Sequence, residues 1–351
     1  MTASPLIVAT FAFDAALHEW LSIQIRGLLS IEPATVHGTR LYNYALISAG
    51  QCEDHAAATL VASHHLAYER LFMQTPEAEL ADIGPWLVEI PSQPDERLLR
   101  ALAQQAAAQA MTLLCSPVRL PKLCEHLRSF MYGAMPDGSP VMLRYFDPRV
   151  GFEIFRQWPE SVQQHFAMPL AWWDGWDSDL QRRHISGEST SKISPLKARI
   201  ELSTAWCNAM DLTGEAHLIV ALLAEELEES NHDSSHRLEQ IHPVLRRQIA
   251  KKALAFSKKA GLVSWNNRAM ACRHALLQHA NFYQDPEFLS TLLDTGVNSL
   301  EAVLALVPKQ THADWDNDRE QMLIRLYDEL VCALPFFDTS TASITRRFGA
   351  D

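Results

Sequence analysis

The sequence predicts an α+β protein of two lobes: an N-terminal α/β lobe with a small mixed sheet, and a C-terminal lobe made only of helices. Strand-like and helix-like segments alternate up to about residue 150, whereas only helical patterns follow residue 195. A polar run at 181–192 separates them and is typical of a linker. The predicted divisions are an N-terminal extension (1–40), an α/β lobe (41–178), a polar linker (179–198), a helical lobe (199–338) and a tail (339–351).

The first lobe is expected to contain three short apolar strands and the helices between them. The strands are predicted at 41–47, 86–90 and 111–115, and the helices at 54–66 and 95–109. Asp95 is the expected N-cap of the second helix, because its side chain can accept a backbone N–H of the first turn.

A third helix and a last strand complete this lobe. Ser116 followed by Pro117 predicts a helix start. The apolar stripe of this helix would be Leu120, Leu123, Leu127 and Phe130. Apolar side chains alternate over 141–146 and predict a strand. We expect it to stop at Asp147, because the residue before Pro148 is disfavoured in helical geometry.

The helical lobe is predicted from apolar stripes at helical spacing. These are Leu245, Ile249, Ala253 and Phe256, and then Leu323, Leu326, Tyr327 and Leu330. Beside the linker stand Trp172, Trp173 and Trp176. They are interpreted as sealing the joint between the lobes, with an exposed patch for a partner as the alternative.

Composition excludes several classes of protein. The 351 residues carry a formal net charge of −12 and no long basic block, which argues against nucleic-acid binding and anionic membrane surfaces. No apolar run approaches the roughly 20 residues of a membrane span, and no signal peptide is evident, so a cytoplasmic protein is expected. The six cysteines are scattered, which predicts reduced thiols rather than disulfides or a zinc site.

The usual enzyme signatures are missing, so neither catalysis nor a cofactor is expected. One metal-dependent hydrolase alternative rests on His232, Asp233 and His236, although a hydrophilic loop is the favoured interpretation. Cys124 lies beside an apolar stripe and is interpreted as a packed thiol. The glutamates at 225, 226, 228 and 229 suit a solvated helix end, with a basic partner as the alternative.

The corner formed by Arg144, Asp147 and Arg149 has two interpretations. Charges so close to an apolar strand are costly to bury unless they pair with one another, which favours an internal ion-pair network. In the functional alternative, Arg149 is offered to a carboxylate or carbonyl of a partner.

Several spaced motifs over residues 41–173 resemble one known family. They are Tyr44-Ala45-Leu46-Ile47; Tyr68, Leu71-Phe72, Thr75-Pro76-Glu77, Leu80 and Gly84-Pro85-Trp86-Leu87-Val88; His126-Leu127-Arg128 and Phe130; Pro136-Asp137-Gly138; and Arg144-Tyr145-Phe146-Asp147-Pro148-Arg149-Val150. This pattern is similar to the effector chaperone (adaptor) family of type VI secretion, Tap or Tec, which is defined by a domain of unknown function, DUF4123. One departure is Ser48-Ala49-Gly50, where the family usually has Asp-Ala-Ala.

The resemblance implies a protein that acts by binding rather than by catalysis. Such chaperones hold a toxin in the cytoplasm of a Gram-negative bacterium and help to load it onto the VgrG spike, in the service of bacterial competition. The expected partners are one toxin and VgrG, and the expected partner-binding residues are Tyr68, Trp86, Arg144, Asp147 and Arg149. An immunity-type protein that binds a toxin to neutralise it is a further alternative.

Overall fold

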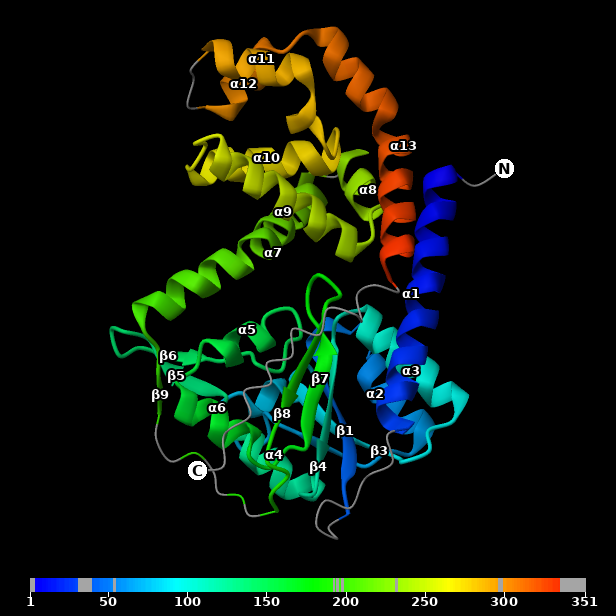
Figure 1. Ribbon diagram of the computed structural model, residues 1–351, viewed down its shortest axis with the longest axis vertical. Helices are drawn as coiled ribbons and strands as arrows, with labels where there is room; N and C mark the ends of the chain where they lie inside the picture. Colours follow the sequence, from blue (N-terminus) through cyan, green and yellow to red (C-terminus); the bar gives the residue numbers. More distant parts are fainter. Residues whose placement is uncertain are drawn as a thin grey trace. The chain divides into compact units, whose positions relative to one another are not determined.

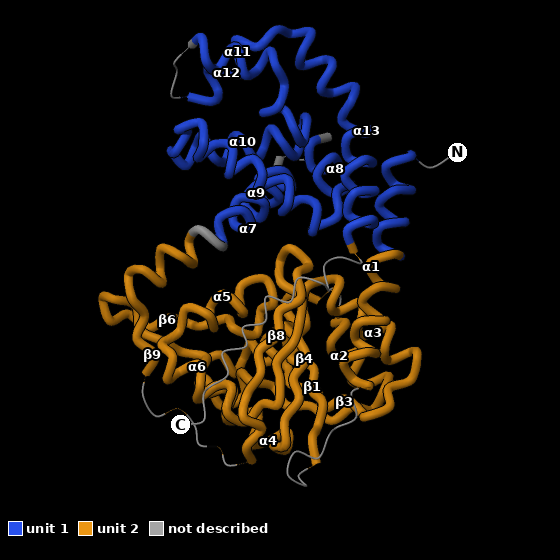
Figure 2. The backbone as a smooth tube through the Cα atoms, in the orientation of Figure 1, with its two compact units in different colours: residues 1–15, 213–333 blue, residues 16–212, 334–351 orange. Residues whose placement is uncertain are grey.

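The computed structural model describes residues 4–30, 40–52, 55–191, 193, 196, 199–230, 233–295 and 299–334. The chain divides into two compact units, coloured separately in Figure 2. We call residues 16–212 with 334–351 the sheet unit, and residues 1–15 with 213–333 the helical unit. The divisions fall inside two long helices, α1 (Pro5–Ser30) and α7 (Thr204–Ser230).

The sheet unit is built on a six-stranded sheet in the order β2-β3-β1-β4-β7-β8. Every pairing between neighbours in this sheet is antiparallel. The strands are β1 (Tyr42–Ser48), β2 (Tyr68–Arg70), β3 (Pro85–Ile90), β4 (Met111–Ser116), β7 (Trp172–Trp176) and β8 (Arg182–Ser186). The expected small mixed sheet is therefore corrected to a larger antiparallel one, because alternation of strands and helices does not fix strand direction.

A second, three-stranded sheet is the mixed one. Its order is β6-β5-β9, and β5 pairs antiparallel with β6 but parallel with β9. Its strands are β5 (Tyr132–Ala134), β6 (Pro140–Met142) and β9 (Ile200–Glu201). The turn between β5 and β6 contains Gly138 with a φ of +83°, a conformation that glycine adopts without a steric cost.

Helices cover both faces of the large sheet (Figure 1). One face packs on α4 (Leu120–Arg128), α5 (Gly151–Arg156) and α6 (Glu160–Ala167). On this face Trp173 stacks on Phe152, with ring centroids 4.5 Å apart. The other face lies against α2 (Ala56–His64), α3 (Glu96–Ala107) and the part of α1 that belongs to this unit, where Trp20 contacts Trp176.

Of the three tryptophans expected at a joint between lobes, Trp173 and Trp176 are core residues of the sheet unit and Trp172 is partly buried. Trp173 and Trp176 are both fully buried, and the partners of their rings lie within the same unit. Adjacent residues of β7 face opposite sides of the sheet, so the cluster fills two cores rather than one surface.

Most predicted elements of the first lobe are confirmed. β1, β3 and β4 coincide with the expected strands within a residue, and α2 and α3 occupy the expected helices. Asp95 caps α3 by accepting the N–H of Leu98 at 2.7 Å. The stripe on α4 is buried as predicted, from Leu120 to Phe130.

The start of α4 was placed wrongly by the sequence. The helix begins at Leu120, not after Ser116. The Ser116 hydroxyl donates to the carbonyl of Pro169 at 2.6 Å and accepts the N–H of Val118 at 3.1 Å. Serine hydroxyls compete in this way for local backbone groups, and here the hydroxyl builds a turn instead of a helix cap.

The last predicted strand is also shorter than expected. β6 ends at Met142, and a turn follows in which the N–H of Asp147 donates to the carbonyl of Arg144 at 3.0 Å. Tyr145 and Phe146 are both buried although they are adjacent. A flat strand would send their side chains to opposite faces, whereas the turn buries both on one side.

Part of the expected polar linker is a strand. Residues 182–186 form β8, the outer strand of the large sheet. A polar stretch of this kind is typical of a linker. In the structure it forms a strand because Arg182 and Arg183 form ion pairs with Asp174 and Asp177.

Among the described residues, the helical unit consists of α1 up to residue 15, of α7 from residue 213 onwards and of six later α-helices. These are α8 (Asp233–Glu239), α9 (Pro243–Lys259), α10 (Trp265–Leu277), α11 (Pro286–Thr295), α12 (Leu300–Leu306) and α13 (Lys309–Ala333). The predicted stripes are buried, except that Phe256 is only partly covered. Ser264 and Ser299 cap α10 and α12 through their hydroxyls, as serine does at helix starts.

α1 is long and apolar enough to cross a membrane by length and composition alone, with a mean hydropathy of 1.4 over its most apolar stretch. The expectation that no segment reaches this length is therefore corrected, since Asp14 does not offset its apolar neighbours. Core helices and N-terminal signal sequences share this composition, so the feature is weak evidence of a span. In the structure α1 buries a stripe of Leu17, Leu21, Ile25 and Leu29.

Candidate protein-binding surface

One outer strand of the large sheet carries an aromatic stack. β2 is hydrogen-bonded to β3 and stands at the edge. Tyr68 stacks on Trp86 with centroids 5.0 Å apart, and the guanidinium of Arg70 lies 4.8 Å from the Trp86 ring. Trp86 is buried and donates its indole N–H to the carbonyl of Ala81 at 3.1 Å. The stack therefore fixes the edge strand, while Tyr68 keeps an exposed face.

The segment from Tyr68 to Gly84, which we call the edge segment, exposes apolar side chains. The exposed fractions are 38% for Tyr68, 46% for Met73, 50% for Leu80 and 57% for Ile83. Single exposed apolar residues are common, and this segment is a candidate binding surface because its four exposed apolar side chains lie on or shortly after an edge strand.

The edge segment is held by contacts from α4 and β5. Arg128 donates through Nε to the carbonyl of Leu71 at 2.8 Å and through Nη1 to Oε1 of Gln74 at 3.1 Å. The hydroxyl of Tyr132 donates to the carboxylate of Glu77. Gly84 abuts the ring of Phe72, where a Cβ atom would lie 2.4 Å from a ring carbon. The surface is therefore preorganised, which lowers the entropy cost of binding.

The Arg144–Asp147–Arg149 corner is an internal ion-pair network. Arg149 donates to both carboxylate oxygens of Asp147, from Nε at 2.9 Å and from Nη2 at 2.8 Å, and Arg144 adds a contact at 3.0 Å. Burial by itself raises the pKa of Asp147, but the hydrogen bonds and charge of Arg149 and the charge of Arg144 bring that pKa below its usual value. Asp147 and most of Arg149 are buried, whereas Arg144 is half exposed.

The structure brings the two groups of proposed partner-binding residues near one another. Phe72 of the edge segment contacts Phe146 of the corner, with centroids 6.2 Å apart. Tyr68 and Arg144 are accessible to solvent, whereas Trp86, which stacks on Tyr68, and Asp147, which pairs with Arg144, are buried. Sequence reasoning missed Met73 and Ile83, because no periodic pattern tells an exposed apolar residue in an irregular segment from a buried one.

The opposite edge of the sheet carries a hydrogen-bonded chain of polar residues. Nδ1 of His184 lies 2.9 Å from Oδ2 of Asp174, and Nε2 of His184 lies 3.0 Å from Oγ of Ser186. This is the order of a catalytic triad. However, Arg182 donates to both oxygens of the buried Asp174 at 3.0 Å. Because both oxygens of that carboxylate are already paired, we interpret the chain, which we call the clasp, as a structural contact that fixes β8 to β7.

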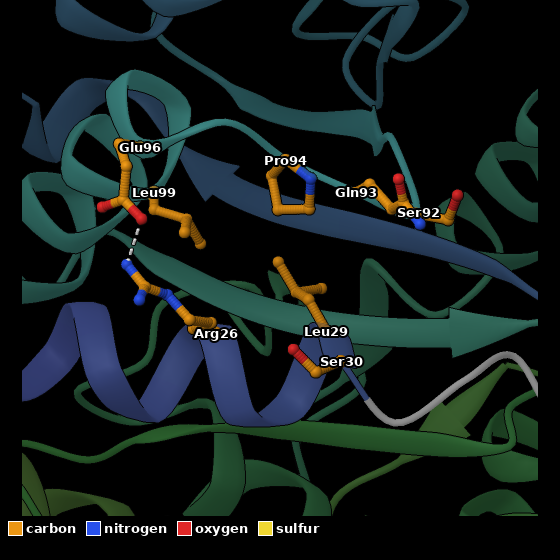
Figure 3. A pocket seen from close by; sticks show the side chains of 8 residues that line it. All are labelled: Arg26, Leu29, Ser30, Ser92, Gln93, Pro94, Glu96 and Leu99. Atoms are coloured by element: carbon orange, nitrogen blue, oxygen red, sulfur yellow. Dashed lines mark hydrogen bonds and ion pairs between the residues drawn. The ribbon is translucent and has the colours of Figure 1, made fainter.

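A hollow of about 610 Å³ lies between the end of α1 and the start of α3 (Figure 3). Its lining mixes polar and apolar side chains, and Arg26 and Glu96 form an ion pair of 2.5 Å in it. Both of these side chains are more than half exposed, so the pair is of the weak surface kind. Nothing in this arrangement indicates a chemistry.

The candidate metal group lies mostly outside the described residues, and the candidate thiol is buried. His232 lies outside the residues that the structure describes, as does the side chain of Asp233, and His236 is exposed on α8. Within the described part of the chain, no three His, Cys, Asp or Glu side chains gather as metal ligands. Burial raises the pKa of the Cys124 thiol to about 11, which agrees with the interpretation of a packed thiol.

The edge segment and the corner both lie within a stretch of the chain that matches one family model. Residues 43–165 match the family model described as a domain of unknown function, DUF4123. The match covers most of the large sheet together with α2 to α5. No curated protein and no solved structure matched the chain.

Proposed function

We propose that this protein is a non-catalytic chaperone, or adaptor, that binds one type VI secretion toxin in the cytoplasm and helps to load it onto the VgrG spike. The observation that supports this most is a coincidence of position. The segment richest in motifs resembling the chaperone family lies within the DUF4123 match and is also the segment that exposes apolar side chains at a sheet edge.

The geometry suggests how a toxin segment is held. β2 has only three residues, and the carbonyl of Arg70 on its outer side already accepts a hydrogen bond from Arg128 at 3.4 Å, so a partner is held by side chains of the edge segment rather than by strand pairing. The apolar side chains of the edge segment then supply buried area, and the exposed guanidinium of Arg144 can pair with a partner carboxylate. None of these steps requires a reacting group.

The direct test is to isolate the tagged full-length protein from its native cytoplasm and identify what accompanies it by mass spectrometry. The proposal predicts recovery of one toxin together with a VgrG-type protein. The candidate toxin should then co-elute with the purified chaperone at low and at moderate salt. Failure to co-elute under both conditions contradicts the proposal.

Deletion of the gene separates this function from that of an immunity protein. Loss of a loading chaperone abolishes export of the toxin and leaves the cells unharmed by their neighbours. Loss of an immunity protein leaves export intact and makes the cells sensitive to the toxin. The second outcome rejects the chaperone function.

A further inference from the structure

The helical unit contains an open groove of about 1170 Å³ between α9, α11 and α13. We call it the helical-unit groove. Apolar side chains from all three helices form its floor, among them Phe256, Leu289 and Leu326. Lys252, Lys259 and Arg325 line it as well, together with the carboxylate of Glu329. The groove therefore combines an apolar floor with three cations and one anion.

The floor is a fixed surface rather than a loose gap. Phe256 stacks on Tyr283 with centroids 5.3 Å apart and an interplanar angle of 15°. The same ring contacts Phe282 and Phe288, two fully buried residues of the unit core. At the mouth, Leu293 is 81% exposed. An apolar side chain left in water beside an open apolar groove favours burial by a partner.

The charges indicate what kind of partner fits. Lys252 and Lys259 are exposed and form no ion pair with the residues that the structure describes. Arg325 shares its charge with Asp318 at 2.8 Å. In a chain of net charge −12, cations gathered around an apolar floor select for a ligand with carboxylates on its flanks.

We propose that the helical-unit groove binds an amphipathic helix of a partner protein, with an apolar stripe on the floor and Asp or Glu residues facing Lys252 and Lys259. Recognition of a helix in a groove uses apolar anchors at i, i+3 or i+4, and i+7, and the groove offers apolar side chains from three helices to receive them. The groove lies outside residues 43–165 and in the other unit from the edge segment. The inference thus goes beyond the proposed function and does not depend on it.

The test uses two synthetic helical peptides and the full-length protein. Each peptide is fluorescently labelled, has about five turns and carries a leucine stripe. One has Glu on the flanks and the other has Lys in the same positions. Fluorescence anisotropy should show that the Glu peptide binds at least about tenfold more tightly than the Lys peptide, a difference of about 1.4 kcal/mol.

Charge-reversal variants locate the site. The double variant Lys252→Glu/Lys259→Glu should weaken binding of the Glu peptide about tenfold and strengthen binding of the Lys peptide. The matched control is Lys258→Glu, which changes an exposed lysine of the same helix that does not line the groove. This control should leave both affinities unchanged.

Three results overturn the proposal. The first is that the wild-type protein binds neither peptide or binds both equally. The second is that Lys258→Glu weakens binding as much as the double variant does. The third comes from sedimentation: a dimer of the wild-type protein that the double variant dissociates means that a second copy fills the groove. None of these measurements requires a toxin or a spike protein, so their failure is separate from failure of the proposed function.

Discussion

The two outer strands of the large sheet, β8 and β2, differ in the side chains that they and their neighbouring segments place at the edge. At β8, Arg182 forms an ion pair with Asp174 of β7, and Arg183 forms one with Asp177, which directly follows β7. At β2, the following segment leaves Met73, Leu80 and Ile83 open to solvent. An unprotected sheet edge invites pairing with other chains, and proteins commonly block it with charge. The difference teaches that β8, the closed edge, is fixed by ion pairs to the β7 region, whereas β2, the open edge, carries the Arg70–Asp82 ion pair but is followed by exposed apolar side chains.

Loss of the buried carboxylate at the closed edge should give the largest effect on stability. Asp174→Ala leaves Arg182 and His184 without their common partner, and breaking such a buried pair costs about 3 to 5 kcal/mol. Chemical denaturation followed by hydrogen exchange of β7 and β8 measures this cost. The control, Ser186→Ala, removes only the outer hydroxyl and should cost less than about 1.5 kcal/mol. Equal costs for both variants would contradict the clasp.

Ser186→Ala also tests whether the clasp is a catalytic relay. The wild-type protein should hydrolyse an activated ester no faster than the Ser186→Ala variant does, because Arg182 already occupies both oxygens of Asp174. A burst of product that depends on Ser186 would show instead that the closed edge carries an activity.

The corner beside the open edge should respond next most strongly. Arg149→Ala removes two hydrogen bonds from buried Asp147, and we expect a loss of about 2 to 4 kcal/mol. Arg144→Ala removes a half-exposed partner and should cost less than about 1 kcal/mol. If Arg149→Ala keeps its melting temperature but loses partner binding, the corner is a contact site rather than a support.

Acid should affect the helical unit before it affects the corner. Burial, together with the charges of His312 and His279, lowers the pKa of His274 to about 3. The unfolded chain takes up this proton near pH 6.5 and the folded chain does not, so stability is complete above pH 6.5 and falls as pH decreases. The loss is at most about 1.4 kcal/mol per pH unit.

The pKa of Asp147 is lowered instead, so its stabilising contribution is lost only as pH falls below about 3.9, the usual pKa of an aspartate. Hydrogen exchange at pH 5 should therefore show faster opening in α10 and α13 than in the large sheet. His274→Asn should remove most of this difference between pH 5 and pH 7. An unchanged pH profile in that variant would show that another group carries the acid sensitivity.

The smallest expected effect on stability belongs to the open edge. Met73→Asp and Ile83→Asp change side chains that are about half exposed, so the free energy of unfolding should shift by no more than about 0.5 kcal/mol. Melting temperatures measured by calorimetry check this. A large destabilisation would mean that these residues support the fold, and the contrast between the two edges would disappear.

Periodicity was sufficient to predict the strands β1, β3 and β4 and the buried stripe of α4, because each shows a local apolar pattern. It failed where a long-range contact decided the structure. Ser116 bonds to Pro169, 53 residues away, and the arginines of β8 depend on aspartates of β7 and the turn after it. The motif at 144–149 predicted the ion pairs correctly, since their partners are local, but the exposure of Met73 and Ile83 has no counterpart in sequence pattern.

The most direct measurement of the central claim is quantitative recovery of the toxin with tagged wild-type protein, with Ile83→Asp and with Leu306→Asp. Leu306 of α12 is a matched control for Ile83 in size and exposure, since Ile83 is 57% exposed and Leu306 is 59% exposed. The account predicts that Ile83→Asp loses most of the recovered toxin at an unchanged melting temperature, and that Leu306→Asp recovers as much as the wild type. Equal recovery with all three proteins would contradict binding at the edge segment.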